Sequence, residues 1–178
     1  MTNIFRTSLT CTVCKTSRTS AENMFFCHVS VSTNIQEGIQ KLCASETLSG
    51  CNSVFCDSCG CNQPTLKSHS FEKIGKYLIL HLSRFYNFGG KLLKDQSPVL
   101  CSSRITVACP EDNEVSFDRS FDLIAAINHS GTLDHGHYTS DIKDIISSTW
   151  YHCNDRAVIQ SDGSIDSNLA YVLIYREL

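Results

Sequence analysis

The chain has 178 residues, 42% of them hydrophobic and 19% charged, which fits one globular domain with a real core and excludes an intrinsically disordered chain. Its formal net charge is -3 and Lys and Arg form no long run, so a nucleic-acid partner is not expected. No apolar run is long enough to span a bilayer, so no membrane partner is expected either.

The cysteine content indicates a reducing compartment. Eleven cysteines are an odd number, so they cannot all pair within the chain. Residues 1–10 contain no apolar segment of signal-peptide length. We therefore expect a cytoplasmic or nuclear protein, in which closely spaced cysteines more often bind metal or take part in chemistry than form disulfides.

The first third of the chain contains one predicted strand and one predicted helix. Residues 25–31 alternate in a mostly strand-like pattern. Thr33 then precedes Gln36 at the spacing of a capping box, which predicts a helix start. The helix is short and amphipathic, because apolar residues recur at helical spacing at Ile35, Ile39, Leu42 and Cys43.

The remainder of the chain is strand-rich. Residues 77–85 read YLILHLSRF and residues 121–128 read FDLIAAIN, and both patterns predict buried strands, the first one buried on both faces. Three further short strands are predicted at 137–143, 149–153 and 170–175, separated by turns that contain Gly and Asp. We expect an α+β fold with a mainly antiparallel sheet.

Two C-x2-C pairs predict a metal site. Cys11 and Cys14 form the first pair, and Cys56 and Cys59 form the second. Four thiolates suit structural zinc, which prefers soft ligands in a tetrahedron. The long gap between the pairs suggests two hairpin tips brought together by intervening strands and a helix. The alternatives are that the cysteines are buried separately as small apolar residues, or that the nearby Cys61 replaces one ligand.

A histidine-rich segment is a candidate for acid–base chemistry. Residues 129–138 read HSGTLDHGHY, and Gly136 beside His137 indicates a close backbone approach or unusual dihedral angles. In the downstream WYHCND sequence, either Asn154 or Asp155 could accept the second imidazole N–H and fix the tautomer. On its own, this pattern is more typical of a structural histidine.

The ordered combination of these motifs resembles the ubiquitin-specific proteases, in their fingers and palm. The resemblance extends from Cys11 to Leu178, ending in AYVLIYREL. It implies a papain-like cysteine protease fold with an antiparallel-sheet palm and zinc-bearing fingers. The fingers would occupy about 9–70 and the palm about 71–178, within one partial protease domain over residues 1–178.

The resemblance also implies roles for single residues. His137 matches the catalytic histidine of the G-H-Y motif, Asn154 matches the third member of the triad, and Asp155 matches the adjoining acidic position. The loop before the histidine would form one wall of a narrow channel for the diglycine tail of ubiquitin. The residues expected to contact substrate there are His129, Asp134, His135, Gly136 and Tyr138.

The nucleophile of that family lies in an N-terminal Asn/Asp-x-Cys box that is followed by a helix, and no such box precedes the first C-x2-C pair of this chain. We therefore expect the C-terminal part of a deubiquitinating cysteine protease without its N-terminal thumb lobe, inactive alone, with structural zinc. The complete enzyme would hydrolyse the bond after the C-terminal glycine of ubiquitin, so ubiquitin and ubiquitinated proteins are the expected partners. The alternative is a catalytically dead module that binds ubiquitin or serves as a scaffold. A zinc-ribbon nucleic-acid module would explain only the C-x2-C pairs.

Overall fold

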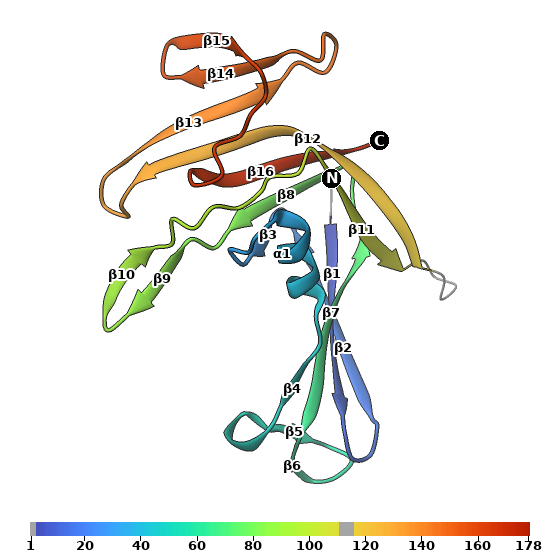
Figure 1. Cartoon of the computed structure of the whole chain (residues 1–178). Helices are drawn as coiled ribbons and strands as arrows, with labels where there is room; N and C mark the ends of the chain where they lie inside the picture. The colour runs from blue at the N-terminus through green and yellow to red at the C-terminus, as the bar shows by residue number, and fades with distance from the viewer. Residues whose placement is uncertain (1–2, 111–115) are drawn as a thin grey trace.

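The computed structural model describes residues 3–110 and 116–178, which form two main sheets and one α-helix (Figure 1). The larger sheet has the order β15-β14-β13-β12-β16-β8-β3, and β11 pairs with β12 beside this path. Its strands are β3 (Cys27–Val29), β8 (Tyr77–Leu82), β11 (Arg104–Pro110), β12 (Ser116–Gly131), β13 (Gly136–Lys143), β14 (Trp150–Asn154), β15 (Ala157–Ser161) and β16 (Ala170–Glu177).

The smaller sheet has the order β2-β1-β7-β4 and extends away from the larger one (Figure 1). Its strands are β1 (Asn3–Cys11), β2 (Ser17–Met24), β4 (Glu46–Leu48) and β7 (Thr65–Lys73). A 3-10 turn, η1, covers Gly50–Asn52. Two separate hairpins complete the fold, and they are β5 (Val54–Cys56) with β6 (Cys61–Gln63) and β9 (Phe85–Phe88) with β10 (Lys91–Lys94).

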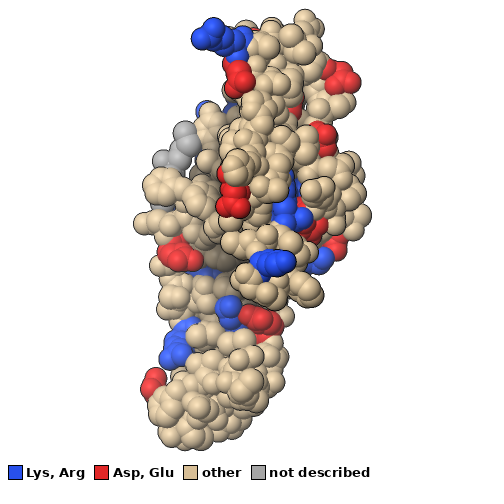
Figure 2. All heavy atoms as spheres, turned by 90° about the vertical axis from the view of Figure 1, so that its left-hand side faces the viewer, with Lys and Arg blue, Asp and Glu red and all other residues tan. Residues whose placement is uncertain are grey.

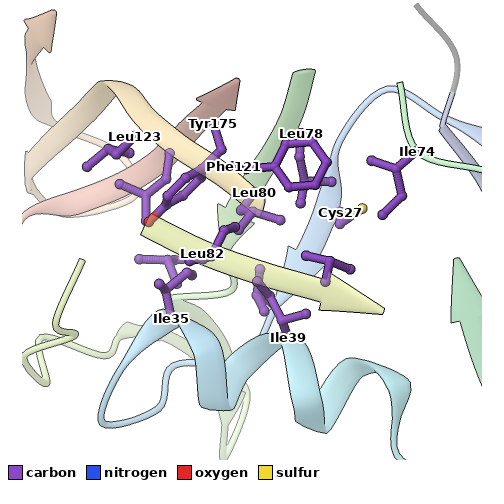
Figure 3. Close-up of a cluster of buried hydrophobic side chains, with 14 of the residues drawn as sticks. Cys27, Ile35, Ile39, Ile74, Leu78, Leu80, Leu82, Phe121, Leu123 and Tyr175 are labelled. Atoms are coloured by element: carbon purple, nitrogen blue, oxygen red, sulfur yellow. The ribbon is translucent and has the colours of Figure 1, made fainter. Parts of the chain in front are cut away.

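The core lies between α1 (Ile35–Cys43) and one face of the larger sheet (Figure 3). Ile35 and Ile39 are buried on the inner side of the helix, and β8 contributes the fully buried Leu78, Leu80 and Leu82. Residues between these leucines are only partly buried, so the prediction of a strand buried on both faces was wrong. The alternation shows that β8 buries one face completely and leaves the other partly open.

The start of the helix differs by one residue from the predicted capping box. Asn34, not Thr33, is the N-cap, and its Oδ1 accepts a hydrogen bond from the Glu37 amide at 2.9 Å. The Glu37 carboxylate in turn accepts a hydrogen bond from the Thr33 amide at 3.2 Å. The Gln36 side chain instead bonds to both backbone groups of Thr106 in β11. Gln36 therefore ties the helix to the sheet and has no part in the cap.

The other predicted elements are present with shifted ends. The strand expected over 25–31 shortens to β3, and the segment 77–85 divides into β8 and the start of β9. Pairing is antiparallel as expected, apart from the parallel pair of β3 with β8. The division at about residue 70 remains a prediction, although β3 and α1 precede that boundary and join the larger sheet or its core. None of the described helices is long and apolar enough to cross a membrane.

The cap generates a test of helix stability. Replacing Asn34 with Ala leaves the Glu37 amide without its acceptor, so the free energy of unfolding should fall by about 1 kcal/mol. Urea denaturation followed by circular dichroism would measure the change. Asn34→Ser is the matched control, because serine also caps helices and should lose much less stability. Equal losses in the two variants would contradict the role of the side-chain acceptor.

Candidate active site and metal centre

Two predicted catalytic residues meet where two neighbouring strands end. His137 is the second residue of β13, and Asn154 is the last residue of β14. The Nε2 atom of His137 lies 2.7 Å from Oδ1 of Asn154. An amide oxygen can only accept a hydrogen bond, so Nε2 must carry the proton. In the neutral ring, Nδ1 then holds a lone pair and can act as a base.

The third predicted catalytic residue takes no part in this hydrogen bond. Asp155 directly follows β14 in the turn to β15, where its φ of 50° lies in the left-handed region. Aspartate tolerates this conformation better than most residues. Of the two acceptors proposed for the imidazole, the structure pairs Asn154 with the ring, and a catalytic role for Asp155 remains a prediction.

Gly136 is required by a close approach between strands. A Cβ atom at this position would lie 2.2 Å from Nε2 of His129 and 2.8 Å from the carbonyl oxygen of Ser130. Both distances are shorter than real Cβ contacts, so a side chain would force β12 and β13 apart. The sequence analysis predicted a close approach or unusual dihedral angles beside His137, and the structure supports the close approach.

His129 is not in the loop where the sequence analysis placed it. It lies in β12 and is only 4% exposed, with its ring among the aromatic rings of Phe85, Tyr138 and Tyr171. Burial, and secondarily the charge of Lys94, lowers the pKa of His129. At His129 the chain is already paired with β13, so this residue belongs to the sheet and not to the loop. Its ring packs against Gly136 and supports the hairpin that β12 and β13 form.

The remaining predicted substrate residues are accessible. Asp134 and His135 lie in the short connection between β12 and β13, and both are exposed. Tyr138 is 57% exposed and, as the neighbour of His137 in a strand, points to the opposite face of the sheet. Contact of these residues with a substrate remains a prediction.

The four predicted metal ligands are brought together by two hairpins. Cys11 ends β1 and Cys14 follows in the turn to β2, while Cys56 ends β5 and Cys59 follows in the turn to β6. All four Sγ atoms lie within 4.8 Å of one another, and those of Cys14 and Cys56 are 3.4 Å apart. Zinc–sulfur bonds of about 2.3 Å in a tetrahedron require sulfur–sulfur distances of about 3.8 Å. The cluster therefore fits a four-thiolate metal site.

The surroundings of these thiols shift their pKa values in opposite directions. Hydrogen bonding to Thr16, through its side chain and backbone, lowers the pKa of Cys14 to about 6. A hydrogen bond with Cys14, together with burial, raises the pKa of Cys59 to about 12. Cys61 lies outside the cluster, because its exposed Sγ is directed to the carbonyl oxygen of Cys59. The structure thus favours the predicted ligand set without Cys61.

The sequence analysis missed Asp141, a carboxylate that is only 4% exposed in β13. Its two oxygens accept hydrogen bonds from Asn128 in β12 and from His152 in β14. The sequence signal for Asp141 was its position inside a predicted strand, because an aspartate buried there requires hydrogen-bonding partners. Neither Asp141 nor His152 was among the site residues predicted from the sequence.

Comparison with known proteins connects this geometry with one family. The family model "Ubiquitin carboxyl-terminal hydrolase" matches residues 1–175. Ubiquitin carboxyl-terminal hydrolase 4 of Mus musculus is 31% identical over 149 residues, covering 80% of this chain and 15% of the mouse protein. Probable ubiquitin carboxyl-terminal hydrolase 1 of Schizosaccharomyces pombe is 30% identical over 158 residues, covering 82% of this chain and 19% of the yeast protein.

The fold agrees with this assignment. A solved structure of the SAGA Ubp8/Sgf11/Sus1/Sgf73 DUB module bound to ubiquitin aldehyde matches with a TM-score of 0.87 at 22% identity. The match covers 99% of this chain and 41% of that one. This chain thus spans less than half the length of each protein compared here. It belongs to the ubiquitin carboxyl-terminal hydrolase family, in its ubiquitin-specific protease branch.

Proposed function

We propose that this chain is the histidine-bearing part of a cysteine protease that hydrolyses the peptide or isopeptide bond after the C-terminal glycine of ubiquitin. The observation that carries the proposal is the 2.7 Å hydrogen bond between His137 and Asn154 in a chain of this family. A similar fold occurs in a DUB module whose solved structure is described as bound to ubiquitin aldehyde, and this supports ubiquitin as the partner.

In the proposed reaction, Nδ1 of His137 takes the proton of a cysteine thiol. The thiolate attacks the glycine carbonyl, a carbon–sulfur bond forms, and the tetrahedral intermediate expels the amine, which receives the proton from His137. Water, deprotonated by the same ring, then hydrolyses the thioester and releases the ubiquitin carboxylate. Asn154 keeps the ring oriented through both steps, because its carbonyl oxygen holds Nε2–H in place.

We further propose that the attacking thiol is not one of the eleven cysteines of this chain. Cys153 adjoins Asn154 in β14, but consecutive strand residues face opposite sides of the sheet. Burial raises the pKa of Cys27 to about 12 and that of Cys101 to about 11, which leaves both as poor nucleophiles. Cys43 and Cys109 lie against or in the core, Cys61 begins β6 just after the metal cluster, and Cys51 lies in η1.

We also propose that the four-cysteine cluster holds a structural zinc ion. The role required of the ion is to join the tips of the β1–β2 and β5–β6 hairpins, which lie at the end of the smaller sheet away from the larger one (Figure 1). Retention of reduced thiols at this site is consistent with the proposed cytoplasmic or nuclear location. On the face in Figure 2, basic and acidic side chains are interspersed, which supports a protein partner over a nucleic acid.

The metal proposal predicts about one zinc per chain. Purified protein from zinc-supplied medium should contain this amount by elemental analysis, and the Cys56→Ser/Cys59→Ser variant should lose it because two of four ligands are gone. Cys61→Ser is the matched control and should retain the zinc. Retention by the double variant, or loss in the control, would contradict the assigned ligand set.

If the attacking thiol lies outside this chain, the chain alone should not react with a ubiquitin probe that carries a C-terminal electrophile. Intact-mass spectrometry would detect any covalent adduct. Rapid labelling of one of the chain's cysteines would overturn the proposal that the thiol comes from elsewhere. Tight binding of ubiquitin that never leads to turnover, even with a cysteine-bearing lobe present, would instead favour a catalytically dead binding module.

When this chain is combined with a cysteine-bearing N-terminal lobe, we expect cleavage of a fluorogenic ubiquitin C-terminal amide. His137→Ala should lower kcat/KM by about 10²–10⁴-fold, because it removes the base. Asn154→Ala should lower it by about 10²-fold or less, since the ring loses only its orientation. Adding Asp155→Ala should worsen the Asn154 variant if Asp155 partly substitutes for it.

His135→Ala serves as the control for these variants, because His135 is exposed in the neighbouring loop. It should retain most of the activity. If His135→Ala abolished cleavage while His137→Ala did not, the assignment of the base would be wrong.

A further inference from the structure

One face of the larger sheet carries two pairs of polar residues that follow each other along β13 and β14. Side chains two residues apart in a strand share a face, so His137 and Asp141 of β13 lie on the same side. His152 and Asn154 of β14 share that side, because His152 is the cross-strand partner of Asp141. Thr139 lies between His137 and Asp141 on this side, so the pairs His137–Asn154 and Asp141–His152 follow each other in one row along β13 and β14.

Asp141 is the most buried member of this row. It is 4% exposed, and its Oδ1 accepts a hydrogen bond from Nδ1 of His152 at 2.8 Å. Its Oδ2 accepts a second one from Nδ2 of Asn128 at 2.7 Å. A buried carboxylate is stable only with such partners, so the three side chains hold β12, β13 and β14 together.

The backbone pairing between β13 and β14 does not extend to the catalytic pair His137–Asn154. The register of β13 with β14 runs from Lys143 opposite Trp150 to Ser140 opposite Cys153. Asn154 follows that last pair, and His137 precedes it by three residues. His137 is paired with Ser130 of β12, and Asn154 is paired with Ala157 of β15. The two catalytic side chains therefore meet beyond the part of β13 that pairs with β14, and Asp141–His152 is a side-chain link within that part.

We propose that Asp141, through His152, is a positioning residue for the catalytic pair. The link fixes the end of β14 against β13, and this sets the position of the Asn154 amide relative to Nε2 of His137. The inference rests on the proposed function for its catalytic meaning. The positional effect itself can be measured on this chain without a substrate.

The test is nitrogen-15 NMR of the histidine rings in this chain. In the unchanged protein, the His137 ring should be held in the Nε2–H tautomer by Asn154. Asp141→Ala removes both acceptor oxygens, and we expect the His137 ring to lose this single tautomer and its hydrogen-bonded Nε2 proton signal. A folded Asp141→Ala variant with an unchanged His137 signal would overturn the proposal.

His152→Ala gives a second variant in case the buried substitution prevents folding. His152 has 33% side-chain exposure and its removal leaves the hydrogen bond between Asn128 and Asp141 in place. It should produce the same loss at His137, and an unchanged signal in this variant would equally overturn the inference. Asp144→Ala is the matched control, because this exposed carboxylate accepts hydrogen bonds from Ile146 and Ser147 within the turn after β13.

A charge swap separates positioning from general destabilisation. In Asn128→Asp/Asp141→Asn, the new amide can donate to the new carboxylate and accept from His152, so all three strands remain linked. We expect this double variant to recover the His137 tautomer, and a failure to recover it in a folded protein would contradict the link.

With the cysteine-bearing lobe present, Asp141→Ala should lower kcat by about 10- to 100-fold with little change in KM, since a misplaced catalytic group slows the chemical step. Loss of the NMR signal without any activity in the unchanged protein would leave the positional inference standing and refute the proposed function. Normal activity with an unchanged ring signal in the variant would refute the positional inference alone.

Discussion

The arrangement of the whole larger sheet depends on the pairing of one strand, β12. It is 16 residues long, which allows its first part to pair with β11 and its second part with β13, while β16 pairs along its middle on the other edge. β11 carries the backbone groups that the helix contacts through Gln36, and β13 carries His137. Register along β12 therefore determines where both the core and the candidate base lie.

A buried guanidinium adds a second constraint at the edge of this sheet. Arg84 is fully buried just after β8 and donates to the backbone carbonyl groups of Ala170, Asp95, Ser97 and Ser167. Burial lowers its pKa, but the four carbonyl oxygens replace water around the charge. These hydrogen bonds hold the segment after β10 and the start of β16 against the end of β8. β16 is thereby held beside β12, from which the hairpin carrying His137 extends.

Sequence reasoning succeeded where the signal is local. The C-x2-C pairs lie in hairpin turns, so their spacing already encodes two adjacent thiols, and Gly136 beside His137 indicated a close backbone contact that the structure contains. It failed where partners come from distant strands. The burial of His129 depends on Phe85 and Tyr171, and Gln36 is bound to β11 instead of taking part in the helix cap. Neither contact has a sequence pattern.

The same distinction explains why the sequence indicated His137 and Asn154 but not the nearby Asp141. His137 and Asn154 stand at strand ends, where exposed polar residues are common and a motif is easy to see. Asp141 stands inside β13, and its environment follows from the register of three strands, which no single segment specifies. A hydrogen bond at an exposed strand end is readily lost to water unless the strands are fixed nearby. A base and its orienting amide that meet at such an end therefore require a buried link behind them, and the Asp141 carboxylate meets that requirement.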